Sequence, residues 1–533
     1  MKSTPVVRPL PTSTPILAAP LERSSVAAAA ALAVLLLAVS AQTSALAQET
    51  TAASPKPTLW VEPRVSVGAT LSDNGSLSST DPRSEQLIEV SPGVRLVINR
   101  PSLRGFLDYS LRGLYYAQDT SGDKLRQALS ASGTLNAWDN LAFIDVSGVI
   151  DDRAVSAFSP TSNAFGDTNR SQTTQFRVSP YLRGDLAGLA DYELRYNLDT
   201  RSTDTNTRSD LTVQALSLAL SSRMQGQTLG WTFNASSQEV DYSIGRTTRS
   251  DNLRVGLLAA ITPQLRSTVY VGVESNDILT PTRQSYNTIG LDVDWRPSSR
   301  SRVFVGLENR YFGNAHNIAL EHRTAQTVWR LTDTRGVIDS PLQAAQASLG
   351  SIYTLLDNLY AAGTPDPIER AQRINAELLN LGLPADAQMF QNFLSSSATV
   401  QRSQSLSFAL LGQRSVVTFA LTRNRSNRLQ SMLNLGDDFD ASSRIDQQGA
   451  SINLAHRLTP VSSVNASLAR QTSEGSGIGP TRTNRSTSFA LGYTTRLAPR
   501  TSGTVQLRRT QYDNSAVNAF SETAISALLT HRF

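Results

Sequence analysis

The chain has 533 residues, of which 40% are hydrophobic and 17% charged, and its formal net charge is +5 at pH 7. It contains no Cys, which excludes disulfides, thiolate metal sites, Cys nucleophiles and a lipid anchor attached to Cys. The 49 basic residues, all Arg except three Lys, are spread among 44 acidic residues rather than clustered, so we expect no nucleic-acid binding.

The N-terminal segment resembles an export signal. Basic residues precede an apolar stretch at 26–39, and the small residues Ala45 and Ala47 stand just before Gln48. A charged region, a short apolar region and a small-x-small cleavage site are typical of a secretory signal peptide. We therefore predict that the mature chain starts at Gln48. The predicted segments are a signal peptide at 1–47 and a disordered tail at 48–58.

Beyond this tail, segment after segment alternates between apolar and polar residues. In one of them, Ile289, Leu291, Val293 and Trp295 alternate with Thr, Gly and Asp. A period of two predicts β-strands. A soluble sandwich would alternate in the same way, so the choice of a membrane barrel rests on the export signal, the number of strands and the end of the chain.

The connections between these segments are of two kinds. Short connectors are centred on a Pro, which presets a turn, and they contain Pro263, Pro297, Pro460 and Pro499. Longer polar stretches lie between them, at 72–85, 151–170, 199–208, 427–443 and 473–484. Short turns that alternate with long loops are typical of an outer-membrane barrel, in which the short turns are periplasmic.

The spacing of the connectors gives a strand number. A hairpin repeat of about 37 residues predicts roughly 22 strands, within a range of about 20 to 24. The count is 22 if a turn near His322 to Ala325 splits residues 318–332 into two strands, and 21 otherwise. Barrel strand numbers are normally even, which favours 22. An aromatic girdle is predicted near the strand ends, formed by Trp138, Trp231, Trp295, Trp329, Tyr109 and Tyr270.

One insertion, at 337–396, interrupts the strand pattern. Apolar residues recur there at helical spacing, from Leu342 to Leu359, and a second helix is expected between an N-cap at Asp366 and a terminating Gly382. With 22 strands this insertion lies outside the barrel or folds into its lumen. Plug, outer cap, docking element and plain loop elaboration all remain open interpretations.

The end of the chain completes a final strand. Ile525, Ala527, Leu529 and Phe533 fall on one face of it together with His531. A terminal aromatic on an alternating strand resembles the signal that delivers barrels to their assembly machinery. The fold prediction is thus all-β: residues 59–533 form a single transmembrane antiparallel β-barrel of about 22 strands with one helical insertion.

Several motifs resemble one family, the uncharacterised outer-membrane β-barrel proteins associated with PEP-CTERM/exosortase systems and exopolysaccharide gene clusters, which are similar to putative β-barrel porins. The motifs are Trp60-Val-Glu-Pro-Arg-Val, Tyr311-Phe-Gly-Asn314, Asp366-Pro-Ile-Glu-Arg-Ala371, Leu381-Gly-Leu-Pro384, His456-Arg-Leu-Thr-Pro460 and His531-Arg-Phe533. The resemblance implies an outer-membrane location and a link to envelope polysaccharide or exported-protein sorting. It implies no established activity and no functional residues.

No enzyme signature accompanies these features. The four His residues (His316, His322, His456 and His531) stand outside any Gly-x-Ser-x-Gly or His-Glu-x-x-His motif. The acidic stretch Gly436–Asp440 offers oxygens to a hard cation but lacks the spacing of a known calcium loop. We predict no catalytic, metal or cofactor site.

The leading functional hypothesis is a pore or export conduit for an exopolysaccharide or PEP-CTERM-linked envelope system. A non-conducting scaffold that docks partners through the insertion is the alternative, and an outer-membrane enzyme is a remote one. Expected partners are outer-membrane lipid, lipopolysaccharide and the barrel-assembly machinery, with anionic polysaccharide or its export components as cargo-side partners. Lumen arginines would either guide an anionic saccharide or, as we favour, form a lattice with carboxylates that stiffens the wall.

Overall fold

The computed structural model describes residues 59–533 except 119–123, 161–168, 205–209, 225, 339–355, 357–359, 361–363, 365–369, 371–372, 375–392, 396–397, 430–435, 478 and 516. The predicted signal peptide, including Ala45, Ala47 and Gln48, lies outside the described residues, as do the tail and most of the insertion. All described residues belong to the compact unit Pro57–Phe533.

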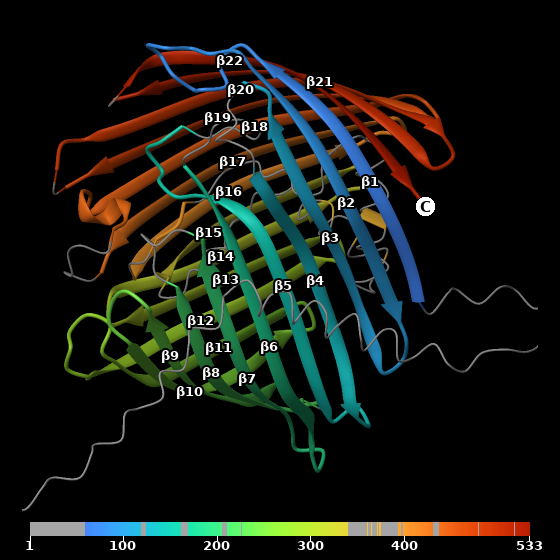
Figure 1. The fold of residues 1–533 in the computed structure, drawn as a ribbon. Helices are drawn as coiled ribbons and strands as arrows, with labels where there is room; N and C mark the ends of the chain where they lie inside the picture. Colours follow the sequence, from blue (N-terminus) through green and yellow to red (C-terminus); the bar gives the residue numbers. More distant parts are fainter. Residues whose placement is uncertain are drawn as a thin grey trace, which may run out of the picture. The chain divides into compact units, whose positions relative to one another are not determined.

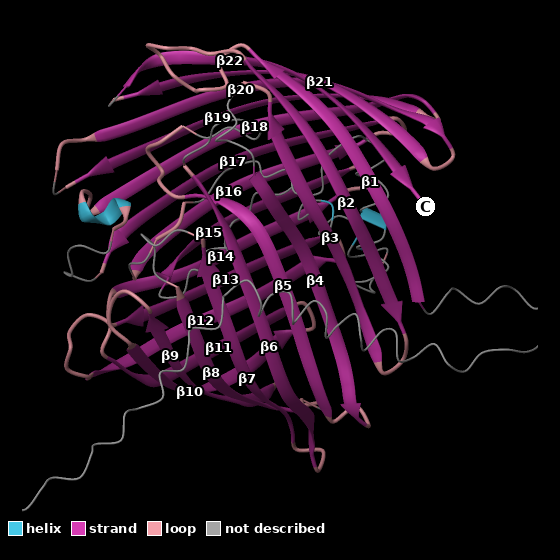
Figure 2. Ribbon diagram, in the orientation of Figure 1, coloured by secondary structure: helices cyan, strands magenta, loops and turns pink. Residues whose placement is uncertain are grey.

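Twenty-two antiparallel strands form one sheet, which closes into a barrel (Figures 1 and 2). The first strand, β1, pairs with the last, β22, from Arg64 opposite Arg532 to Ser72 opposite Ala524. Closure leaves no sheet edge, and a membrane-spanning sheet needs this because hydrocarbon cannot satisfy unpaired backbone groups. The predicted fold class and strand number are confirmed. The strands are β1 (Leu59–Ser72), β2 (Glu85–Asn99), β3 (Leu103–Tyr116), β4 (Lys124–Trp138), β5 (Ala142–Ala154), β6 (Arg170–Leu186), β7 (Ala190–Thr203), β8 (Leu211–Ser222), β9 (Leu229–Tyr242), β10 (Thr248–Thr262), β11 (Leu265–Asn276), β12 (Gln284–Ser298), β13 (Ser301–Arg310), β14 (Gly313–Arg323), β15 (Thr327–Ile338), β16 (Thr399–Leu411), β17 (Ser415–Arg428), β18 (Arg444–Thr459), β19 (Ser462–Ser476), β20 (Arg482–Ala498), β21 (Thr501–Asn514) and β22 (Val517–Arg532).

The turn that decides the strand number lies between β14 and β15. Thr324 forms it: its backbone N–H donates to Thr327 O at 2.8 Å, and its hydroxyl accepts from the N–H of Thr327 at 2.9 Å. A threonine hydroxyl that bonds the backbone ahead of it favours a tight turn over a continued strand. Residues 318–332 therefore contribute to two strands.

Connections alternate between the two ends of the barrel. One end, which we call the short-turn end, carries connections such as the one between β10 and β11 at Pro263. Three of the four Pro connectors lie between strands there, whereas Pro297 is still within the last residues of β12. The other end, the long-loop end, carries the connection from β15 to β16 that contains the insertion. The 22-strand count thus places the insertion on the side of the long loops.

The two faces of the wall differ in polarity. On β11 the residues Val269, Val271 and Val273 are 51%, 57% and 44% exposed, and similar apolar rows cover the same face of neighbouring strands. Alternate residues such as Glu274 face the other way and are buried by polar partners. An exterior apolar belt around a closed barrel is the architecture of Gram-negative outer-membrane proteins.

Exposed tryptophans lie close to the short-turn end of this belt. Trp231 and Trp329 are each the third residue of a strand that leaves this end, and Trp295 is near the end of a strand that reaches it. Their exposed fractions are 43%, 43% and 46% in that order. Tyr270 does not join them. It lies in the middle of β11 with its ring over Gly290, where an added Cβ would be 2.2 Å from the ring.

Of the insertion, the described residues Leu356, Tyr360, Arg370, Arg373 and Ile374 are helical, and the rest of the two predicted helices lies outside the described residues. The short 3-10 helix η2 (Asp438–Asp440) lies elsewhere, in the connection between β17 and β18. Among the described residues, no helix is long and apolar enough to cross a membrane.

Candidate functional site

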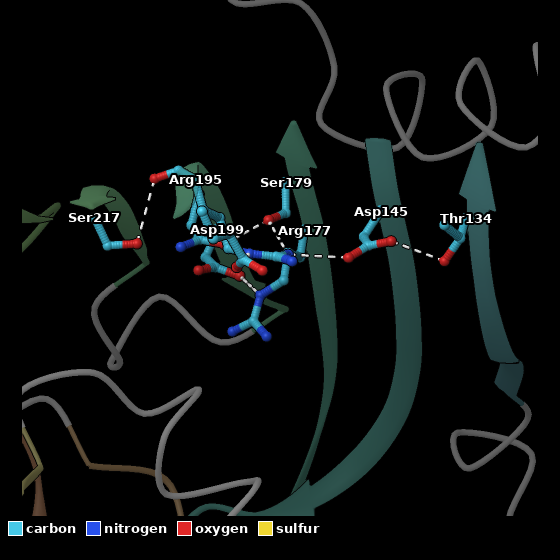
Figure 3. Close-up of polar contacts among 9 residues, drawn as sticks. Thr134, Asp145, Arg177, Ser179, Arg195, Asp199 and Ser217 are labelled. Carbon is cyan, nitrogen blue, oxygen red and sulfur yellow. Dashed lines mark hydrogen bonds and ion pairs between the residues drawn. The ribbon is translucent and has the colours of Figure 1, made fainter. Parts of the chain in front are cut away.

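Arginines and carboxylates of the inner wall hold each other in place. On β5 to β7, the Arg195 guanidinium donates to Asp145 and Ser179, both at 2.9 Å (Figure 3). The same guanidinium donates to Glu193 at 2.8 Å. It also lies over the ring of Tyr181, 3.8 Å from its centroid. The side chain is therefore fixed on several sides at once.

The lattice continues to either side of Arg195. Thr134 on β4 donates to Asp145 at 2.7 Å, and Arg177 on β6 pairs with Asp199 on β7 (Figure 3). Equivalent ion pairs recur around the inner wall, where they join Arg64 and Arg95 to Asp108, Arg112 to Glu89, Arg254 to Glu308, Arg310 to Glu274, and Arg508 to Glu522. These charge-assisted pairs join strands that are neighbours or up to three places apart and so stabilise the wall, which gives these arginines a structural role.

At the long-loop end, two distant hairpins meet. The carboxylate of Asp438, in the β17–β18 connection, accepts from Ser156 Oγ at 2.8 Å and from the backbone N–H of Ala157 at 2.7 Å. Ser156 and Ala157 belong to the β5–β6 connection. Ten strands separate these hairpins in one direction around the barrel and eight in the other, so this contact lies across the barrel mouth.

An apolar cluster supports the contact. Phe158, Phe439 and Ile445 are 3%, 1% and 1% exposed and pack together with Ala157, and Phe393 of the insertion packs against them. The ring centroids of Phe393 and Phe439 are 6.0 Å apart. Burial of each large apolar side chain contributes about 1.5–3 kcal/mol, so the cluster favours the contact. We call the four apolar residues Ala157, Phe158, Phe439 and Ile445, together with Ser156 and Asp438, the mouth latch.

The end of the insertion runs along the latch. Leu394 donates its N–H to Ala154 O at 2.9 Å, next to an isolated bridge between Ala154 and Phe393. Ser395 Oγ donates to the Asp437 carboxylate at 3.2 Å. The insertion therefore touches both hairpins that meet at the mouth.

The wall at β20 and β21 adds polar contacts to the β5–β6 connection. The amide groups of Asn484 and Asn514, near the long-loop ends of β20 and β21, donate to carbonyl oxygens of the β5–β6 connection, Asn514 to Phe158 O and Asn484 to Ala157 O at 3.3 Å. Arg428 donates to Phe439 O at 2.8 Å. Side chains from several strands thus hold both connections in place.

The carboxylates of the acidic stretch Gly436–Asp440 form hydrogen bonds within this structure. Asp437 caps η2 by accepting from the Phe439 N–H at 2.9 Å, and Asp440 accepts from the Gly436 N–H at 2.8 Å. Asp438 is committed to the β5–β6 connection. Each carboxylate has a hydrogen-bonding role, and no group of three or more His, Asp or Glu that would suit a metal ion occurs in the described part of the chain.

The four histidines lie on the exterior face of the wall. Three of them bond a hydroxyl directly opposite on the neighbouring strand, close to the short-turn end: His322 with Ser301, His456 with Ser415, and His531 with Thr501, at 2.9, 2.8 and 2.9 Å. His316 instead bonds the Asp333 carboxylate at 2.9 Å, toward the long-loop end.

The predicted assembly-signal residues all lie at or just beyond β22. Leu529 and Ile525 are 47% and 52% exposed and face outward beside Val67 and Leu71 of β1, with Ala527 between them opposite Ala69. Phe533 is 62% exposed, and its N–H donates to Pro63 O at 3.0 Å. They form a continuous exterior row. Their role in assembly stays a prediction.

The latch is the feature that the sequence analysis missed. The polarity of residues 151–170 predicts only a long loop, although Ala157 and Phe158 are an apolar pair within it. A bulky aromatic in an otherwise polar connection was the available signal. Its partner, Phe439, stands inside the acidic stretch that was considered for cation binding.

No family model and no curated protein matches the chain. Similar solved structures include the siderophore receptor PirA from Pseudomonas aeruginosa, at 9% identity over 90% of this chain and 81% of that chain, with a TM-score of 0.42. A mutant of the ferric enterobactin receptor PfeA from the same organism has 10% identity, coverages of 89% and 80%, and a TM-score of 0.43. The FrpB iron transporter from Neisseria meningitidis has 10% identity, coverages of 89% and 82%, and a TM-score of 0.36. Similarities this low carry no argument about activity, and the assignment as an outer-membrane β-barrel rests on the strand pairing and the apolar belt.

Proposed function

We propose that the protein is an outer-membrane conduit whose outer mouth is held shut by the mouth latch. The observation that carries this proposal is the contact of Asp438 with Ser156 and Ala157, which joins two hairpins from different sides of the barrel. A barrel that served only as a rigid scaffold would not need its own loops tied together across its opening. Release of these few contacts would open the mouth while the strand pairing remained intact.

The burial of three described apolar residues of the insertion favours a gate over a docking arm. Its described residues Leu356, Ile374 and Leu394 are 0%, 0% and 2% exposed. A docking element would present apolar side chains to solvent for a partner to cover. These three are already covered by the protein itself, so the scaffold hypothesis has less support than the conduit.

The cargo is proposed from the resemblance described above, which points to an exopolysaccharide or PEP-CTERM-linked envelope system and hence to an anionic saccharide. The inner wall is compatible with such a chain because it is polar and rich in arginine. Arg177 and Arg195 of this wall are held by carboxylates, however, so we assign selectivity to the mouth rather than to the lattice.

Single-channel conductance of the refolded mature protein in a planar bilayer tests the proposal. We expect the wild type to stay mostly closed and an Asp438→Ala variant to open. The matched control is Asp440→Ala, which removes a carboxylate that bonds locally to Gly436. If a correctly folded Asp438→Ala protein and a protein lacking 341–394 both remain silent, the conduit proposal is wrong and the scaffold becomes the better hypothesis.

A further inference from the structure

A group of arginines lies on the exterior of the barrel, away from the lumen. Arg402 of β16 alternates with the outward residues Leu406, Phe408 and Leu410, so it faces outward with them. Four further arginines share its face on the neighbouring strands. The exterior arginine cluster consists of Arg335 on β15, Arg402 on β16, Arg423 and Arg425 on β17, and Arg444 at the start of β18.

Three of these arginines stand side by side across the sheet. Arg335 is directly opposite Arg402 in the β15–β16 register, and Arg402 is directly opposite Arg425 in the β16–β17 register. Like charges directly opposite each other on one face of a sheet are destabilising. Their presence in a row is therefore a cost to the isolated wall, which an anion bound from outside would offset.

The carboxylates of the cluster are too few to balance it. Asp333 accepts from Arg402 at 2.5 Å, and Asp446 lies 2.8, 3.1 and 3.4 Å from Arg423, Arg425 and Arg444. Four guanidinium groups thus share two carboxylates, and that of Arg335 donates to Asn314 O. Glu474 of β19 lies opposite Asp446 of β18 and borders the cluster. When Glu474 is included, the five arginines still outnumber the three carboxylates.

The guanidinium groups form the outermost layer. The side chains of Arg402, Arg423 and Arg444 are each 42% exposed, whereas those of Asp333 and Asp446 are 17% and 12% exposed. Because the carboxylates lie beneath, they hold the guanidinium groups in place and leave N–H donors directed outward. Fixed, planar donors of this kind suit the oxygens of a phosphate group.

The position of the cluster along the membrane normal indicates what it binds. Leu331, Leu406 and Leu421 occupy one register row of the lipid-facing belt, and Arg423 is only two residues above Leu421 on the same strand. At about 3.3 Å per residue, and less along the membrane normal because strands tilt, the guanidinium groups begin roughly 5–10 Å from the apolar row. This is the level of lipid headgroups.

We propose that the exterior arginine cluster binds the phosphorylated headgroup of an outer-leaflet lipid such as lipopolysaccharide. The cluster lies toward the long-loop end, which faces outward in barrels of this class. The proposal concerns the outer surface of the wall and does not depend on whether the barrel conducts. Lipid bound there would seal the wall against the membrane at β15 to β18. The insertion begins and ends within this part of the wall, between β15 and β16.

The wall at β10 to β12, which β13 and β14 separate from the cluster, offers a matched control. Arg249 and Arg283, near the long-loop ends of β10 and β12, pair one to one with Glu239 and Asp251. They have the same chemistry and a comparable height but no excess of positive charge. Replacing them tests whether any two exterior arginines would serve.

The experiment measures binding of purified lipopolysaccharide to the full mature barrel in detergent, together with the resulting rise in unfolding temperature. We expect an Arg402→Gln/Arg425→Gln variant to lose at least tenfold in affinity, an Arg402→Lys/Arg425→Lys variant to lose less, and an Arg249→Gln/Arg283→Gln variant to bind like the wild type. Because the Lys variant keeps both positive charges, it provides a second comparison if the Gln variant fails to fold.

Three results would overturn the proposal. One is unchanged binding by the Arg402→Gln/Arg425→Gln protein once it is shown to be folded. Another is an equal loss in the Arg249→Gln/Arg283→Gln protein, which would indicate a non-specific effect of charge. The last is an equal stabilisation by millimolar inorganic phosphate, which would make this a site for free anions and not for lipid.

Discussion

Asp438 and Ser156 are 282 residues apart in the chain, and their side chains meet at 2.8 Å across the mouth of the barrel. The contact joins the β5–β6 and β17–β18 connections and lies beside the buried ring of Phe439. A hydrogen bond to a charged group in such a place contributes about 1.5–3 kcal/mol. That is enough to shift the ratio of closed to open mouths by roughly ten- to a hundredfold.

A reversible disulfide would lock the latch. The chain has no Cys, so a Ser156→Cys/Asp438→Cys variant would contain a single possible bridge. We expect the oxidised protein to be closed and the reduced protein to be open, because the substitution removes the native hydrogen bonds while the bridge replaces them. Conductance recorded before and after addition of a reductant measures both states. Each single-Cys variant is the control, and equal conductance of oxidised and reduced double variant would show that this contact does not gate.

Shortening Phe158 tests the apolar half of the latch. Phe158 is 3% exposed and lies in a connection rather than in a strand. A Phe158→Ala substitution removes buried contacts worth up to about 3–5 kcal/mol, so we expect the mouth to open more often. Barrel stability should change little because no strand pairing is lost. Liposome swelling with small sugars reports opening, and heat-modifiability on gels reports the barrel. Ile244→Ala, at a residue 38% exposed in the β9–β10 connection, is the control.

The architecture was accessible from the sequence because it is written in local patterns. Period-two alternation and the turn near Thr324 give the strand number, and strand parity then places the insertion on the long-loop side. The latch was not accessible in this way. Contact between Phe158 and Phe439 depends on how the barrel closes, and neither residue is marked by a local period.

Arginine direction was an intermediate case. The inner-wall ion pairs are consistent with the expected arginines of the lumen. Arg402, in contrast, has the same parity as Leu406 and Phe408, and this parity places it outside. Along one strand face, the change from Leu406 to Arg402 marks the upper limit of the apolar belt. Tyr270 is the opposite case. The sequence predicts it in the exterior aromatic girdle, whereas it has the same parity as Glu274 and faces inward.

Charge placed on the belt should impair assembly, whereas charge on the inner face should not. Val271 is 57% exposed in the middle of β11 and faces outward. A Val271→Arg substitution near the membrane midplane costs about 2–4 kcal/mol, so we expect less folded protein in outer-membrane fractions. Thr268→Arg, on the opposite face of the same strand, is the matched control, and its partner across the register is Asp292. Equal levels of both variants would contradict the assigned faces.

Removal of Arg195 separates a stiff wall from a transport path. The guanidinium binds Asp145, Glu193 and Ser179 and covers Tyr181, so an Arg195→Gln change leaves two carboxylates without their main partner. Because Arg195 is about one-quarter exposed, we expect a modest loss, on the order of 1–2 kcal/mol, seen as a lower unfolding temperature. Block of the open Asp438→Ala pore by an anionic polysaccharide should stay the same, because the lattice already engages this charge. Arg500→Gln, in the short turn between β20 and β21, is the control for a lost positive charge. A weaker block in the Arg195→Gln protein with unchanged stability would mean that the lattice carries the anion after all.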